Sequence, residues 1–187
     1  MTDLALGVRR AALGGRVLAV VMGAVLVAMA AQVSIPLPGT PVPMTLQPMA
    51  VLLVGGLLGP ELGALSMILY LAMGAAGLPV FTPTVPLPGI TRLLGPTGGY
   101  LLAYPVAAWA VGAVLRDGSS VRRVACGVFA GLVLIHLGGL AQMAILTGSI
   151  SGAARLATWP FLLGDLLKLV VLVPILTTLT PTIRARL

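Results

Sequence analysis

The chain has 187 residues, of which 59% are apolar and only 8% are charged. In a soluble domain roughly a quarter of the residues are charged, so this composition excludes that class and indicates that lipid surrounds most of the surface. The net charge of +7 comes from only eleven Lys and Arg residues, so their places along the chain are more informative than their sum.

Six apolar segments, each bounded by Gly, Pro or charge, are expected to cross a membrane as helices. A spanning helix takes about 20 residues, so a chain of this length has room for about six. In chain order they cover residues 17–31, 46–58, 62–76, 98–115, 124–146 and 160–179. The second and third are short for a bilayer, so they either extend into the loops or are broken within the membrane. The expected fold is an all-α, six-helix transmembrane bundle that forms one integral-membrane domain over residues 1–187.

The first segment carries two rows of small residues at four-residue spacing, which suits close helix packing in lipid. The rows are Gly15, Ala19 and Gly23, and Ala24 and Ala28. Residues 28–30 (Ala-Met-Ala) also have the form of a signal-peptide cleavage site. The segment leads into a proline-rich stretch unlike a mature N-terminus, however, so we expect it to remain as a helix.

Two proline-rich loops are expected on the outer side of the membrane. Residues 32–45 and 77–96 contain nine of the fifteen prolines and little that could form a helix. Stiff segments lose less entropy when they become ordered, which suits lid loops over an extracellular or periplasmic pocket. Simple surface connections are the alternative interpretation.

The arginines predict the orientation, because cytoplasmic loops near span ends are enriched in Lys and Arg. With both termini in the cytoplasm, the inner segments carry Arg9, Arg10, Arg16, Arg116, Arg122, Arg123, Arg184 and Arg186. The outer loops carry only Arg92 and Arg155. Topology in a bacterial cytoplasmic membrane therefore accounts for the basic charge, and we expect no nucleic-acid partner.

The last segment contains two ionisable residues, Asp165 and Lys168. Each costs at least about 2.5 kcal/mol within a membrane, and a spacing of three places both on one helix face. Other isolated polar residues map to the same outer half: Gln32, Thr45, Gln47, Arg92 and Tyr100. The pattern favours a polar site open to the outside over a structural ion pair or a lysine that reaches the membrane surface. His136 and Gln142 in the fifth segment are interpreted as interhelical hydrogen-bonding groups.

The sequence has no Walker-type phosphate loop, no Cys/His cluster and only one histidine, so we expect neither a metal nor a cofactor. Any ATP hydrolysis would belong to partner subunits. Two other function classes stay open from the residues alone. One is a channel or proton-coupled carrier with Asp165 and Lys168 as a relay. The other is an intramembrane hydrolase that uses Ser149 or Ser151 near His136.

Four longer motifs follow one another along the chain: IPLPGTPVPMTLQ at residues 35–47, GLPVF at 77–81, LGPTGGY at 94–100 and PFLLGDLLK at 160–168. Together they resemble the motifs of the BioY family. The resemblance implies the biotin-binding S component of an energy-coupling-factor (ECF) transporter. It also implies six membrane helices, with a vitamin site near the outer face that the first and third loops close.

The resemblance implies roles for several residues in a biotin site. Asp165 and Lys168 are associated with the ureido end of biotin, and Arg92 with its carboxylate. The remaining expected site residues are Tyr100 and Met44, as a surface for the thiophane ring, and Gln47 and Thr45. Residues 82–91 depart from the family pattern, so no loop ligand for the ureido group is predicted.

Partners also follow from the resemblance. They are the ECF transmembrane subunit and its ATPase subunits, or further copies of this chain if it transports biotin alone. Ala24 and Ala28 are expected to form the surface on which the transmembrane subunit docks. The alternative is that both rows of small residues pack inside the chain's own bundle.

Overall fold

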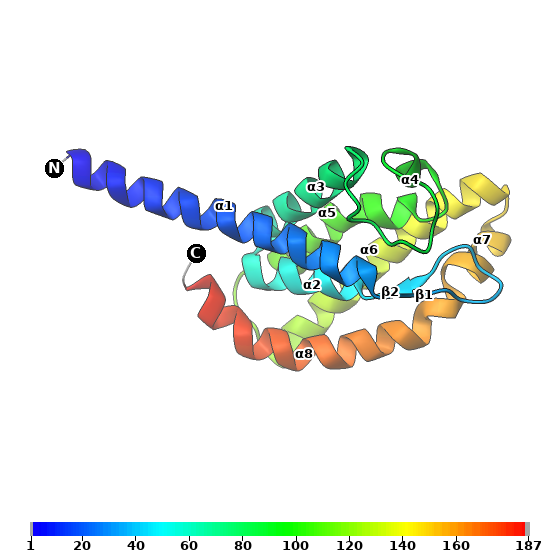
Figure 1. Cartoon of the computed structure of the whole chain (residues 1–187). Coiled ribbons are helices and arrows are strands. Elements are labelled where there is room, and N and C mark those ends of the chain that lie inside the picture. The colour runs from blue at the N-terminus through cyan, green and yellow to red at the C-terminus, as the bar shows by residue number, and fades with distance from the viewer. Residues whose placement is uncertain (1, 186–187) are drawn as a thin grey trace.

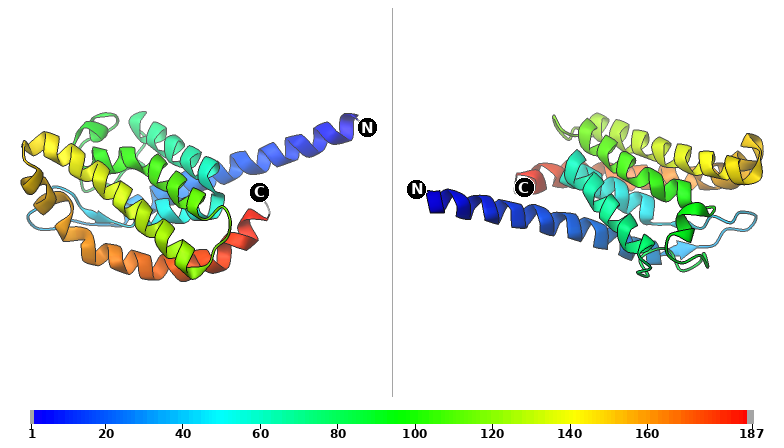
Figure 2. Two further views of the ribbon diagram at one scale, coloured as in Figure 1. Left: turned by 180° about the vertical axis from the view of Figure 1, so that it is seen from behind. Right: turned by 90° about the horizontal axis from the view of Figure 1, so that it is seen from above.

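The computed structural model describes residues 2–185, with side chains described from residue 13 onward. Its long helices are α1 (Thr2–Gln32), α2 (Gln47–Leu58), α3 (Pro60–Ala75), α5 (Gly98–Val114), α6 (Val121–Thr147) and α8 (Leu162–Arg184). Shorter elements are strands β1 (Ser34–Ile35) and β2 (Met44–Thr45), helices α4 (Thr91–Leu94) and α7 (Ile150–Ala157), and the 3-10 turn η1 (Trp159–Phe161). Both termini lie at one end of the bundle, whereas the β1–β2 hairpin, α4 and α7 lie at the other (Figures 1 and 2).

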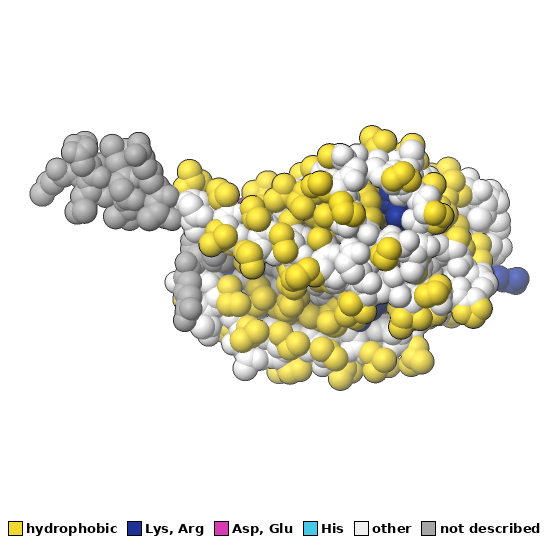
Figure 3. Space-filling model, in the orientation of Figure 1, with side chains coloured by type: hydrophobic (Ala, Val, Ile, Leu, Met, Phe, Trp, Pro, Cys, Tyr) yellow, Lys and Arg dark blue, Asp and Glu magenta, His cyan; other side chains and the backbone are white. Residues whose placement is uncertain are grey.

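The predicted all-α class is confirmed, and much of the face shown in Figure 3 is apolar. Three stretches are long and apolar enough to cross a membrane: Leu13–Gln32, Val121–Thr147 and Ile150–Arg184. Helices α2, α3 and α5 have 12, 16 and 17 residues, fewer than the about 20 of a typical span. The described residues thus support three spanning stretches by length and composition, and the six-span topology stays a prediction.

Helix α7 is not predicted by the apolar pattern, because it is short and amphipathic. Its N-terminus is capped by the Ser149 hydroxyl, which accepts a hydrogen bond from the Gly152 backbone N–H at 3.1 Å. Ala153 and Ala157 are buried four residues apart on its inner side, and Arg155 is exposed. The segment that contains Ser149 and Ser151 therefore begins a helix, and the Ser149 hydroxyl serves as its N-cap.

Helices α5 and α6 approach each other through glycines. A Cβ atom on Gly99 would overlap the carbonyl oxygen of Gly138, and one on Gly138 would overlap that of Gly99. The ring of Tyr100 lies in the same way on Gly139. Such close backbone contact favours helix association in lipid. It also brings Tyr100 beside His136, with 6.1 Å between the ring centres.

Of the small residues of α1, Gly15 is exposed, whereas Gly23 and Ala24 are buried inside the bundle, which leaves Ala24 no surface for the expected docking. Ala24 is 0% exposed, and Ala28 is partly buried against the same core. A Cβ atom on Gly23 would lie 2.5 Å from Oγ of Ser66 on α3. Four-residue spacing indicates close packing but does not specify the neighbouring helix, and here that neighbour belongs to the same chain.

Arginines expected on the cytoplasmic side gather at the end that holds the termini. Arg184 donates to the carbonyl oxygens of Gly56 at 2.7 Å and Leu115 at 2.8 Å, which caps the ends of α2 and α5. Arg116 and Glu61 form an exposed ion pair at 2.6 Å. The side chains of Arg9 and Arg10, and all of Arg186, lie outside the described residues. The grouping supports the predicted orientation, which stays a prediction.

Candidate functional site

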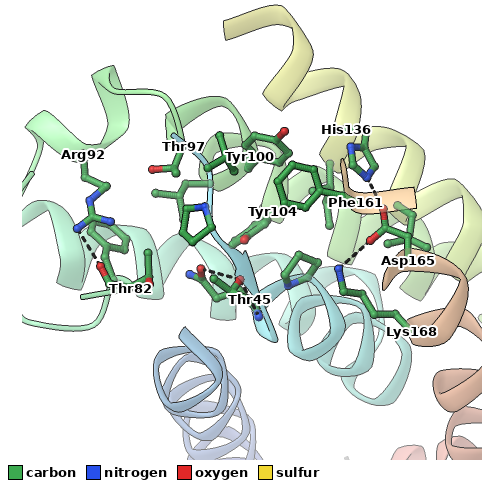
Figure 4. A pocket seen from close by; sticks show the side chains of 18 residues that line it. Thr45, Thr82, Arg92, Thr97, Tyr100, Tyr104, His136, Phe161, Asp165 and Lys168 are labelled. Atoms are coloured by element: carbon green, nitrogen blue, oxygen red, sulfur yellow. Dashed lines mark hydrogen bonds and ion pairs between the residues drawn. The ribbon is translucent and has the colours of Figure 1, made fainter. Parts of the chain in front are cut away.

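The loops and helix ends at the end of the bundle opposite the termini (Figure 1) contribute side chains to one pocket (Figure 4). Its polar and aromatic lining consists of Thr45, Gln47, Phe81, Thr82, Arg92, Thr97, Tyr100, Tyr104, His136, Phe161, Asp165 and Lys168. The space between these walls, including the part open to the outside, is about 600 Å³.

One side of the pocket holds a cluster of three ionisable side chains. Asp165 lies in the first turn of α8, where its Oδ1 accepts from Lys168 Nζ at 2.7 Å. Its Oδ2 lies 2.5 Å from Nε2 of His136 on α6. Asp165 and Lys168 are each only 8% exposed. Because a buried charge requires a partner, the three residues stabilise one another in an apolar setting.

Arg92 lies across the pocket from this cluster and holds the loop around itself (Figure 4). Its Nε donates to the Leu87 carbonyl oxygen at 2.8 Å, and Nη2 donates to those of Thr82 at 3.0 Å and Val85. Nη1 is buried and has no partner among the described residues. Burial lowers the pKa of the Arg92 guanidinium, although an arginine keeps its charge in proteins. The loop therefore places a cation with a free donor in the pocket wall.

A chain of hydrogen bonds connects the first proline-rich loop (residues 32–45) with the second (residues 77–96) through α2 and α3. The Thr45 hydroxyl donates to Gln47 Oε1 at 3.2 Å, and Gln47 Nε2 donates to the Tyr70 oxygen at 2.5 Å. The Tyr70 hydroxyl in turn donates to the Val80 carbonyl oxygen at 3.2 Å. These contacts fix both loops against the helices beneath them.

Aromatic rings line the region between the two charged sides (Figure 4). The ring centres of Tyr100 and Phe161 are 6.3 Å apart, in an edge-to-face arrangement. The Tyr100 hydroxyl donates to the Ala157 carbonyl oxygen at the end of α7, which fixes the ring. The pocket thus has an apolar, aromatic middle and a charged group on either side.

Six of the seven predicted substrate-binding residues line this one pocket: Asp165, Lys168, Arg92, Tyr100, Gln47 and Thr45. Met44 is not among the lining residues; it packs beside Gly164, where an added Cβ would lie 3.2 Å from its sulfur. Successive strand residues point to opposite faces, so Thr45 on β2 faces the pocket and Met44 does not.

His136 forms the interhelical hydrogen bond expected of it, to Asp165 on α8, and it also lines the pocket, which the sequence interpretation did not predict. Its signal was its isolation, since it is the one histidine of the chain and lies in an apolar helix. Gln142 does form the structural hydrogen bonds expected of it, because its Nε2 donates to the carbonyl oxygens of Leu93 and Gly95 at 3.1 and 3.0 Å. Gln32 bonds the Ala28 carbonyl oxygen at 3.1 Å and does not line the pocket.

The profile of the BioY family matches residues 5–185. The chain belongs to the BioY family. A "Probable biotin transporter BioY" of Pyrococcus horikoshii is 40% identical over 143 residues, which cover 76% of this chain and 82% of the relative. The "Biotin transporter BioY" of Thermotoga maritima is 36% identical over 146 residues, or 78% and 84% of the two chains.

A solved structure has the same fold as this BioY chain. It is described as "the S-component for biotin from an ECF-type ABC transporter", with a TM-score of 0.80 and 25% identity. The match covers 88% of this chain and 90% of the other. The motif-based resemblance is therefore confirmed by sequence and by fold, and the relatives are transporters, not enzymes.

Proposed function

We propose that this chain captures biotin in the pocket described above, for uptake as the S component of an ECF-type transporter. The names of its relatives and the likeness to a biotin S-component of known structure support the substrate and the transporter class. The observation that carries the site assignment is the arrangement of the pocket, in which charged groups on opposite sides flank aromatic rings. Biotin has a matching form, with a ureido group at one end, an apolar thioether ring and chain, and a carboxylate.

At the ureido end, Asp165 accepts from an N–H group and Lys168 donates to the carbonyl oxygen. Each carboxylate oxygen can accept more than one hydrogen bond, so Asp165 keeps its contacts with Lys168 and His136 when biotin binds. The lysine ammonium has three donors, of which the contact with Asp165 uses one. No step breaks a covalent bond.

At the other end, Arg92 Nη1 donates to the biotin carboxylate. A contact through two nitrogens is not available, because Nε and Nη2 are already bonded to backbone carbonyl oxygens. Nη1 alone has no partner among the described residues. The contact is therefore a charge-assisted bond from one nitrogen, which still distinguishes a carboxylate from a neutral amide.

The proposal includes six spanning helices and lids formed by the first and third loops. Both loops line the pocket, the first through Thr45 and the third through Phe81 and Thr82. With the termini in the cytoplasm, the pocket opens on the outer side of a bacterial cytoplasmic membrane. Translocation would then use an ECF transmembrane subunit, with ATP hydrolysis by its ATPase subunits.

Calorimetry on the purified chain tests this function directly. We expect saturable binding of biotin, with one molecule per chain. Desthiobiotin, which lacks the thioether ring, and biotin amide, which lacks the negative charge, should bind more weakly. Folded protein that binds none of the three would contradict the proposal.

Arg92→Ala is expected to lower the affinity for biotin more than the affinity for biotin amide. The fold loss for biotin should be about ten times the fold loss for the amide. A hydrogen bond to a charged group contributes about 1.5–3 kcal/mol, and the neutral amide does not form its equivalent. Calorimetry with both ligands measures the difference, and Arg155→Ala, an exposed arginine on α7, is the control. Equal losses for the two ligands would show that Arg92 only holds the loop together.

A further inference from the structure

His136 contacts four different elements of the fold. It extends from α6, and its Nε2 lies 2.5 Å from Oδ2 of Asp165 on α8. Its Nδ1 is 3.4 Å from the Ala157 carbonyl oxygen at the end of α7. Its ring centre lies 6.1 Å from that of Tyr100 on α5 and 6.3 Å from that of Phe161 in η1. The imidazole is therefore held on several sides, and one of its nitrogens faces the carboxylate proposed to bind biotin.

A second cavity lies behind this contact. It is an apolar groove between α6 and α8, lined by Phe129, Val133, Leu137, Leu162, Leu166 and Leu169, with His136 and Asp165 as its ionisable members. Several of these apolar side chains, such as Phe129 at 61% and Leu166 at 58%, are well exposed on the outside of the bundle. The groove thus belongs to the surface that lipid covers.

His136 and Asp165 line both the groove and the pocket, and they are the ionisable residues common to the two. Together with Leu132, which also lines both, they lie between the polar pocket and the lipid-facing groove. Without the imidazole, Oδ2 of Asp165 would face hydrocarbon with no hydrogen-bond donor, and a buried acceptor left without a donor is costly. The carboxylate would turn toward Lys168 or toward water in the pocket.

We propose that His136 is a positioning residue for the biotin site. It holds Oδ2 of Asp165 so that the carboxylate keeps a fixed orientation toward the ligand, and with Asp165 it closes the pocket against the groove. This role rests on the proposed function, because the ligand of Asp165 is taken to be the ureido group of biotin.

A double-mutant cycle tests whether His136 acts through Asp165. His136→Leu should lower biotin affinity about tenfold or more in the parent chain, but less than about threefold in the Asp165→Asn background, because contacting residues are energetically coupled. His136→Gln can place an amide N–H near the position of Nε2 and should retain most of the affinity. Equal losses from His136→Leu in both backgrounds would overturn the proposal.

The matched control is Gln142→Leu, which removes a polar side chain from the same helix away from the pocket. Its effect on affinity should be the same in both backgrounds, since it does not contact Asp165. Thermal unfolding of every variant in detergent shows whether the chain is folded.

A second measurement needs no ligand. His136 is the only histidine in the sequence, so protein made with ¹⁵N-histidine and without a histidine tag gives the signals of one imidazole. Asp165→Asn should shift the Nε2 signal, and Asp117→Asn, in an exposed loop, should not. Unshifted signals in Asp165→Asn would overturn the contact even if biotin binds. If the Nε2 signal shifts in Asp165→Asn but the parent chain binds no biotin, the contact stands and the proposed function is overturned.

Discussion

Asp165→Asn is expected to weaken biotin binding by at least about 2 kcal/mol, or about 30-fold. The side chain keeps its shape, but one carboxylate oxygen becomes an NH₂ group that cannot accept a hydrogen bond. Lys168 then loses a charged partner at 2.7 Å while it stays buried, and Nε2 of His136 loses its partner at 2.5 Å or must change its tautomer. The ureido N–H groups of biotin also meet a weaker acceptor.

Calorimetry with purified protein measures this loss, and thermal unfolding in the same detergent shows whether the variant is folded. Asp117→Asn is the matched control, because Asp117 is an exposed acidic residue between α5 and α6. It should leave biotin affinity unchanged. A folded Asp165→Asn protein with the affinity of the parent would show that Asp165 does not bind biotin.

Gly99→Ala is expected to destabilise the bundle by about 3 kcal/mol, near the upper end of overpacking substitutions. The added methyl group would overlap the Gly138 carbonyl oxygen and lie 2.7 Å from Cβ of Gln142. The obstacle is mainly backbone, which cannot rotate away as a flexible side chain can, so α5 and α6 must separate. Tyr100, the next residue, would then move relative to His136.

Thermal unfolding and biotin calorimetry together measure this effect. Gly15→Ala is the control, because no atom lies within 4 Å of its added Cβ. Alanine is favoured over glycine by about 1 kcal/mol within a helix, so this variant should be unchanged or slightly more stable. If Gly99→Ala has the stability of its parent, the glycine contact does not set the distance between the two helices.

Much of this protein is determined by local features of the sequence. The apolar segment 98–115 predicts α5 at Gly98–Val114, because charged residues follow it, and segment 46–58 predicts α2 at Gln47–Leu58, because Gly and Pro follow it. Asp165 and Lys168 can also be recognised as unusual from the sequence alone. An ionisable residue in an apolar helix is so costly that its presence in the sequence is enough to indicate a partner or a ligand.

The contacts between elements were decided only by the tertiary structure. The spacing of Ala24 and Ala28 indicates close packing without specifying the partner, which the bundle supplies from its own helices. Met44 and Thr45 are equally plausible until the pairing of β1 with β2 sets which of them faces the pocket. His136 and Asp165 are 29 positions apart in the sequence, and they become neighbours only when α6 and α8 pack together. Helical periodicity describes one helix at a time, whereas such contacts depend on how two helices are rotated and shifted relative to each other.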